Sequence, residues 1–108
     1  MNRISVMSDG EYNGQWFDAD KAEVYEENSY HNGNNWISKA TGSQTEHEKL
    51  YLTASGKWVL FSWSQWQGSI DSAELVDEDF AVRWFAKNEY EDENIPEAIK
   101  GLLSNYEL

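Results

Sequence analysis

Residues 49–63 constrain the fold more than any other part of this sequence. Residues 49–53 alternate between apolar and polar side chains, residues 54–56 read Ala-Ser-Gly, and residues 57–63 are mostly apolar. Gly56 can adopt the left-handed conformation that closes a short hairpin loop. The returning segment carries large apolar side chains on both faces, with Trp58 and Leu60 on one and Val59, Phe61 and Trp63 on the other. We therefore predict a β-hairpin whose second strand lies at the centre of a sheet.

Three shorter segments also have the pattern of strands. Residues 21–26 alternate, although Asp18-Ala19-Asp20 could equally begin a helical turn. Residues 36–40 and 72–75 are the other two candidates, and residues 32–35 (Asn-Gly-Asn-Asn) are typical of a loop. The stretch up to Asp18 has few strong core candidates. We predict no strand there and expect residues 1–15 to be loosely ordered.

The hydrophobic period changes after Val76. Phe80, Ala81, Trp84 and Phe85 lie on one face of a helix, and Asp77 is a suitable N-cap. Pro96 favours the start of a second helix, which would place one apolar stripe toward the core. The order of strands first and helices last predicts a single α+β domain over residues 1–108. We expect an antiparallel sheet of about four strands, followed by two C-terminal helices packed on one face.

Charge and composition exclude several classes of protein. The 108 residues include 20 Asp and Glu but only 8 Lys and Arg, and the net charge of −12 opposes direct binding to nucleic acid. No apolar run has the length that a membrane span needs. Cysteine is absent, so disulfides, thiolate zinc sites and a cysteine nucleophile are excluded. Because the N-terminal residues lack an apolar secretion signal, we expect a cytoplasmic protein.

Catalytic and metal-binding patterns are also missing. His31 lies beside the Asn/Gly loop, and His47 lies between Glu46 and Glu48 without a second ligand at metal-binding spacing. On a strand, those two glutamates would share one face with His47 on the other. No nucleophile elbow, phosphate-binding loop or dinucleotide fingerprint is present. We therefore expect no cofactor, no metal and no catalytic residue, with a carboxylate-based enzyme as the least favoured alternative.

Acidic residues are concentrated in the last third of the chain. Between residues 71 and 97 there are ten acids and two basic residues, which accounts for −8 of the total charge. Such a surface attracts basic partners and accelerates their encounter. We predict a non-enzymatic protein that binds a basic protein, as a regulator, an immunity protein or an inhibitor that mimics nucleic-acid charge; its oligomeric state stays open. The predicted contact residues in this region are Asp77, Glu78, Asp79, Glu89, Glu91, Asp92 and Glu93.

Trp66 suggests a different function. It follows the apolar strand and is surrounded by Ser and Gln, so its ring could be exposed to stack on a sugar or to contact a partner. We therefore add Trp66 to the predicted contact residues. A module that binds an aromatic ligand or a carbohydrate is the alternative hypothesis.

Residues 46–88 also resemble a known group of proteins. Residues 48–60 have the pattern E-x-L-Y-x-T-x-x-G-x-W-x-L, and an acidic-capped helix with A-x-x-W follows at residues 77–84. This combination is similar to that of a group of small bacterial proteins of uncharacterised function, which tend to occur in chromosomal accessory regions and on mobile elements. The resemblance implies a hairpin followed by a capped helix, and it implies no activity or catalytic residue.

Overall fold

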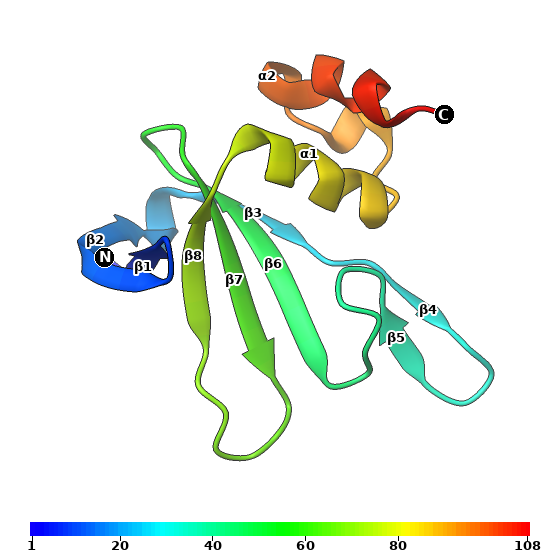
Figure 1. The fold of residues 1–108 in the computed structure, drawn as a ribbon, viewed down its shortest axis with the longest axis horizontal. Coiled ribbons are helices and arrows are strands. Elements are labelled where there is room, and N and C mark those ends of the chain that lie inside the picture. Colours follow the sequence, from blue (N-terminus) through cyan, green and yellow to red (C-terminus); the bar gives the residue numbers. More distant parts are fainter.

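The structure, a computed structural model, describes residues 1–108 and has a six-stranded mixed sheet at its centre (Figure 1). The strand order is β2-β1-β8-β7-β6-β3, and all pairs are antiparallel except β1 with β8. A separate two-stranded sheet, β4-β5, extends from one edge as an arm. The strands are β1 (Arg3–Ser8), β2 (Glu11–Asp18), β3 (Glu23–Glu26), β4 (Ser29–His31), β5 (Trp36–Ser38), β6 (Glu46–Leu52), β7 (Trp58–Ser64) and β8 (Ser72–Val76).

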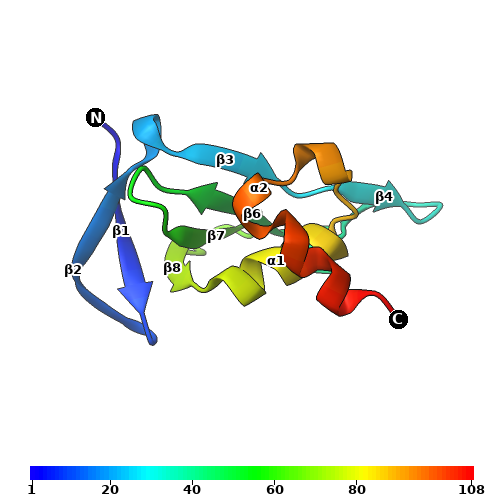
Figure 2. The ribbon, with the colours of Figure 1, turned by 90° about the horizontal axis from the view of Figure 1, so that it is seen from above.

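Two α-helices and three 3₁₀ helices complete the fold. Helix α1 (Glu78–Lys87) follows β8 directly, and α2 (Glu97–Lys100) has only four residues. The 3₁₀ helices are η1 (Ala19–Lys21), η2 (Asp92–Asn94) and η3 (Gly101–Tyr106). In the view from above, α1, α2 and η3 lie together, while the β1–β2 hairpin lies at the other end of the molecule (Figure 2). None of these helices has the length and apolar character that crossing a bilayer would require.

The prediction of an antiparallel sheet of about four strands is wrong. Two of the six strands, β1 and β2, come from the N-terminal stretch for which we predicted none, and β1 adds to the sheet in parallel with β8. Residues 11–16 of β2 are all exposed, so this edge strand has no alternating apolar pattern. The register of the β1–β2 pair also shifts between Ser5 and Met7. A bulge of this kind breaks the two-residue period on which strand prediction depends.

The predicted hairpin and helix cap are both confirmed. Leu52 pairs with Trp58 across the β6–β7 turn, and Gly56 has a φ of +86°. Strand β7 lies between β6 and β8, as its two apolar faces indicated. At the start of α1, the Asp77 carboxylate accepts a hydrogen bond from the backbone N–H of Phe80 at 2.8 Å.

Alternating residues of the central strands point into two separate cores. On one face, Leu50 and Trp58 pack with Trp84 and Phe85 of α1, in a cluster of nine buried residues that also includes Ile99 of α2. On the other face, the β1–β2 hairpin contributes to a smaller cluster of five buried residues: Val6, Phe17, Tyr51, Val59 and Ala73. The helices and the hairpin therefore cover opposite faces of the same strands. We call α1, η2, α2 and η3 together the helix layer.

Candidate binding surfaces

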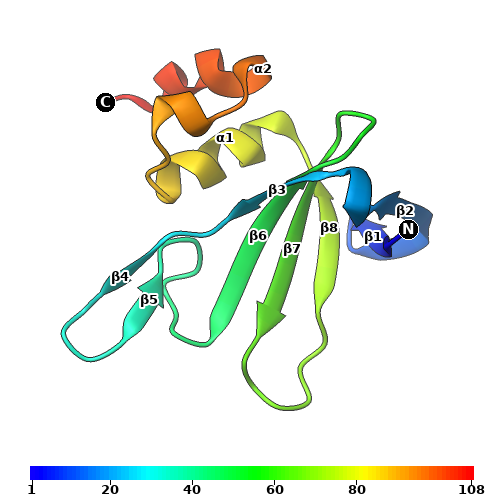
Figure 3. The same ribbon diagram turned by 180° about the vertical axis from the view of Figure 1, so that it is seen from behind.

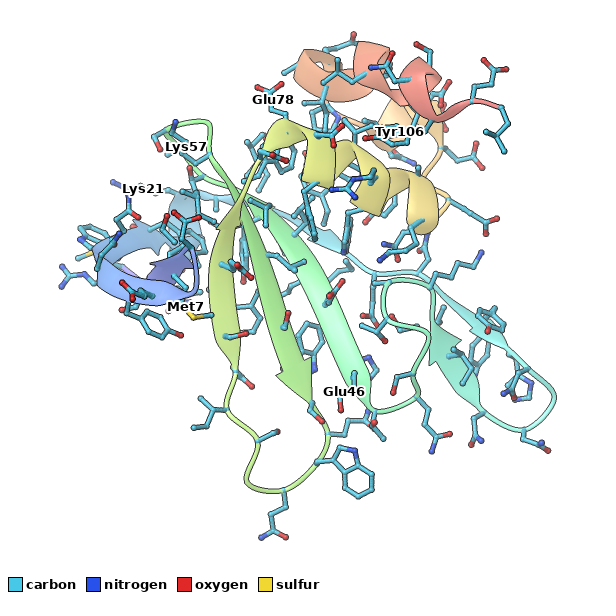
Figure 4. The ribbon with its side chains drawn as sticks, viewed as in Figure 1. Met7, Lys21, Glu46, Lys57, Glu78 and Tyr106 are labelled. Atoms are coloured by element: carbon cyan, nitrogen blue, oxygen red, sulfur yellow. The ribbon has the colours of Figure 1, made fainter.

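Three of the predicted contact carboxylates lie at the N-terminal end of α1. Asp77 caps the helix, and Glu78 and Asp79 occupy its first turn, where the helix dipole favours negative charge. Asp79 lies 3.6 Å from Arg83 and accepts a hydrogen bond from the hydroxyl of Tyr106. Figure 4 shows Glu78 and Tyr106 together on the helix layer. Asp79 is therefore partly neutralised, whereas Glu78 is exposed and forms no ion pair.

The other four carboxylates follow the C-terminal end of α1. Glu89 adopts a positive φ of 54° and pairs with Lys39. Glu91, Asp92 and Glu93 are exposed and, together with Lys100, line a hollow of about 490 Å³. Because α1 has ten residues, this group is separated from Asp77, Glu78 and Asp79 by about 15 Å of helix. The structure thus arranges the seven carboxylates as two groups at opposite ends of α1.

Trp66 is far from both acidic groups. It lies in the β7–β8 loop with 66% of its surface exposed. The loop is ordered by local bonds, since the backbone N–H of Trp66 donates to the Ser64 hydroxyl at 3.1 Å and its carbonyl accepts from the Ser69 hydroxyl at 2.7 Å. In Figures 1 and 3 this loop points away from the helix layer. Trp66 and the carboxylates therefore cannot form one contact surface.

The β4–β5 arm carries exposed aromatic residues that the sequence analysis did not select. Trp36 is 65% exposed and Tyr30 is 47% exposed. The His31 and Trp36 rings meet edge to face across the arm, with centroids 5.2 Å apart. Residues 28–38 contain no Asp, Glu, Lys or Arg, and neither do residues 58–70. In a sequence with 26% charged residues, this pair of charge-free segments is the signal that could have identified the arm.

The base of the arm is tied to the end of α1. The side-chain oxygen of Asn88 accepts from the backbone N–H of Asn28 at 2.9 Å, and its amide donates to the Trp84 carbonyl at 2.9 Å. Asn88 is fully buried, so its side-chain amide would destabilise the fold if it had no hydrogen-bond partners. The Tyr90 hydroxyl donates to the Glu26 carbonyl, and burial raises the pKa of that tyrosine. These contacts connect the arm to residues 89–93, which we call the acidic segment.

His47 contacts one carboxylate and one aromatic ring. Its Nδ1 lies 2.7 Å from Glu27 Oε2, and its ring stacks on Trp63 with centroids 5.5 Å apart. Glu27 also accepts a hydrogen bond from the backbone N–H of Glu48 at 2.6 Å. Glu27 therefore continues the pairing of β6 beyond the end of β3. The structure contains no group of three or more His, Asp or Glu residues placed to hold a metal ion.

Glu48 points to the opposite face of β6 and contacts the helix layer. Its carboxylate accepts a hydrogen bond from the indole N–H of Trp84 at 3.1 Å. Burial raises the pKa of Glu48, although the bond from Trp84 and the charge of Lys87 act in the other direction. This carboxylate supports the packing of α1 on the sheet.

Comparisons with models of protein families, with curated proteins and with solved structures find no match for this chain.

Proposed function

We propose that this protein is a non-enzymatic binding protein whose acidic helix layer contacts a basic protein. The observation that carries this proposal is that five of the seven predicted carboxylates have no ion pair. Only Asp79 and Glu89 pair with cations of the chain itself. Unpaired charges on a rigid surface steer an oppositely charged partner toward it. The carboxylates without an ion pair are Asp77, Glu78, Glu91, Asp92 and Glu93, of which Asp77 caps α1.

The rigidity of the acidic surface supports this role. Ile95 and Ile99 are buried beneath the acidic segment and anchor it in the larger core. Rigid placement lowers the entropic cost of binding. A basic partner would engage the acids without ordering them first, as suits a regulator, an immunity protein or an inhibitor that mimics nucleic-acid charge. We propose the cytoplasm as the place of this action, with no cofactor taking part.

Capture of partners from a nuclease-treated lysate of the host tests this proposal. The tagged protein is compared with a variant carrying Glu89→Gln, Glu91→Gln, Asp92→Asn and Glu93→Gln, at low and at high salt. We expect the wild type to retain a basic protein at low salt and to lose it at high salt, because salt screens exposed charges. The variant should retain at most about one tenth as much while keeping its fold, since its four residues are exposed.

A matched control carries the same change of charge away from residues 89–93. Asp9, Glu11, Asp20 and Glu23 are exposed and lie outside the helix layer. Neutralising these four residues with Asn or Gln should leave capture nearly unchanged. If both variants captured equally less partner, overall charge alone would explain the capture. If both captured as much partner as the wild type, the acidic contact surface would be contradicted.

A second candidate function is binding of an uncharged ligand, such as a carbohydrate, at the exposed tryptophans of the β7–β8 loop and the β4–β5 arm. It is favoured by the exposure of Trp66 and Trp36 on charge-free segments that also carry Asn, Gln and Ser. Exposed indole rings stack on apolar faces, and amide and hydroxyl groups supply hydrogen bonds. Indole N–H resonances should shift across a panel of neutral oligosaccharides. Trp66→Ala and Trp36→Ala should abolish the shifts, while a silent panel would contradict this function.

A further inference from the structure

The face of the sheet opposite the helix layer contains a hollow that the proposed function does not use. Its volume is about 370 Å³, at the lower end of the range of about 300–1,000 Å³ typical of small-molecule sites. The apolar residues Val6, Phe17 and Val59 line it, and all three belong to the smaller core. The hollow lies between the β1–β2 hairpin and the β6–β7 turn, and Leu75 of β8 also lines it, so three parts of the chain build it.

Polar groups with hydrogen-bond donors surround this apolar floor. The lining residues Gln15, Ser55 and Lys57 carry an amide, a hydroxyl and an ammonium group. The turn that carries two of them is fixed, because the Thr53 hydroxyl accepts from the backbone N–H of Lys57 at 3.0 Å and lies 3.1 Å from the Ser55 hydroxyl. No Asp or Glu lines the hollow.

Lys57 is the only charged residue that lines the hollow, and it is free to pair. It is exposed and forms no ion pair within the chain. Figure 4 shows it at the β6–β7 turn, close to the β1–β2 hairpin. On its other side Lys57 borders a second hollow, which Asp9, Asp77 and Glu78 line with it. A ligand in the first hollow must therefore compete with these carboxylates for the ammonium group.

We propose that this hollow binds a small organic carboxylate with an apolar body. The apolar part would contact Val6, Phe17 and Val59, and the carboxylate would accept hydrogen bonds from Lys57 and Ser55. Charge-assisted hydrogen bonds of this kind are about twice as strong as neutral ones. This site recognises the opposite charge from the acidic surface, and the two are linked where Asp77 and Glu78 border Lys57 in the second hollow.

Titration with 3-phenylpropionate, followed by ¹H–¹⁵N correlation spectra, tests the proposal. We expect saturable shifts of the backbone amides of Gln15, Ser55 and Lys57 in the low millimolar range. The uncharged isostere 3-phenylpropanamide should bind at least about tenfold more weakly, because it cannot form the charged contact. Shifts that do not saturate, or equal binding of acid and amide, would overturn the proposal.

Three variants define the role of the charge. Lys57→Gln should weaken binding of the carboxylate by about tenfold and leave the amide unaffected. Glu78→Gln should strengthen binding of the carboxylate about twofold by removing a competitor for Lys57. Lys87→Gln is the matched control, since Lys87 is also exposed and unpaired but lies on α1, and it should change nothing. Equal effects of Lys57→Gln and Lys87→Gln would overturn the assignment of Lys57.

Discussion

The two faces of the central sheet are covered by different kinds of structure. On one face, α1 supplies a continuous apolar stripe and buries Ala81, Val82, Trp84 and Phe85. On the other, the β1–β2 hairpin supplies only Val6 and Phe17 as buried side chains. The helix therefore buries more apolar side chains against the sheet than the hairpin does.

The β1–β2 hairpin leaves part of its face of the sheet uncovered. Phe61 and Trp63 of β7 stay only half-buried. The ammonium group of Lys49 lies 5.4, 5.2 and 5.6 Å from the ring centroids of Tyr51, Phe61 and Trp63, so a cation partly covers this aromatic surface. The same sheet thus has acidic residues over its helix side and an aromatic surface, partly covered by Lys49, on its hairpin side.

The largest expected effect comes from the core of the helix-covered face. Phe85 is fully buried and contacts Tyr25, Trp58 and Tyr90 edge to face, with centroids 5.0–5.8 Å apart. Phe85→Ala should lower the free energy of unfolding by about 3–5 kcal/mol, measured by urea denaturation. A loss below about 1 kcal/mol would contradict the view that this core carries most of the stability.

A smaller effect is expected from the hairpin-covered face. Phe17 is 7% exposed and packs on Tyr51 with centroids 5.0 Å apart. Phe17→Ala should cost about 2–3 kcal/mol, less than Phe85→Ala, because a cavity near the surface can relax or fill with water. Hydrogen exchange should become faster in β1 and β2 and stay slow in α1. Equal acceleration in both elements would contradict the independence of the two faces.

The smallest effect concerns Glu48, the carboxylate at the boundary between the sheet and α1. Burial raises its pKa, so the native protein holds this proton more tightly than the unfolded chain does. Stability should therefore fall as the pH rises from about 4.3 through the raised native value. Glu48→Gln keeps an acceptor for Trp84, should remove this slope, and should raise the stability slightly near neutral pH. Denaturation at several pH values measures both effects, and an unchanged slope would contradict this account.

How far the sequence predicts the fold depends on where each element lies. The β6–β7 hairpin and the Asp77 cap could be predicted because their signals are local: Gly56 in a short turn, and an Asp before an apolar stripe. Strands β1 and β2 could not, because β2 is an exposed edge strand and β1 pairs with β8, about 65 residues away along the chain. The concentration of acidic residues could be predicted from the sequence. Their separation into two groups at opposite ends of α1 could not, because it depends on the length of the helix. The hollow at Lys57 joins residues from three distant segments, and no sequence pattern indicates it.

Mapping the contacts of a hexa-arginine peptide by ¹H–¹⁵N correlation spectra tests the acidic surface most directly. The peptide supplies the charge of a basic partner without its shape, so the shifted amides report where the protein attracts cations. We expect the largest shifts at Glu89, Glu91, Asp92 and Glu93, and their loss in high salt. Shifts of equal size at Asp9, Glu11, Asp20 and Glu23 would contradict it, because the helix layer would then be no more than one part of a uniformly acidic surface.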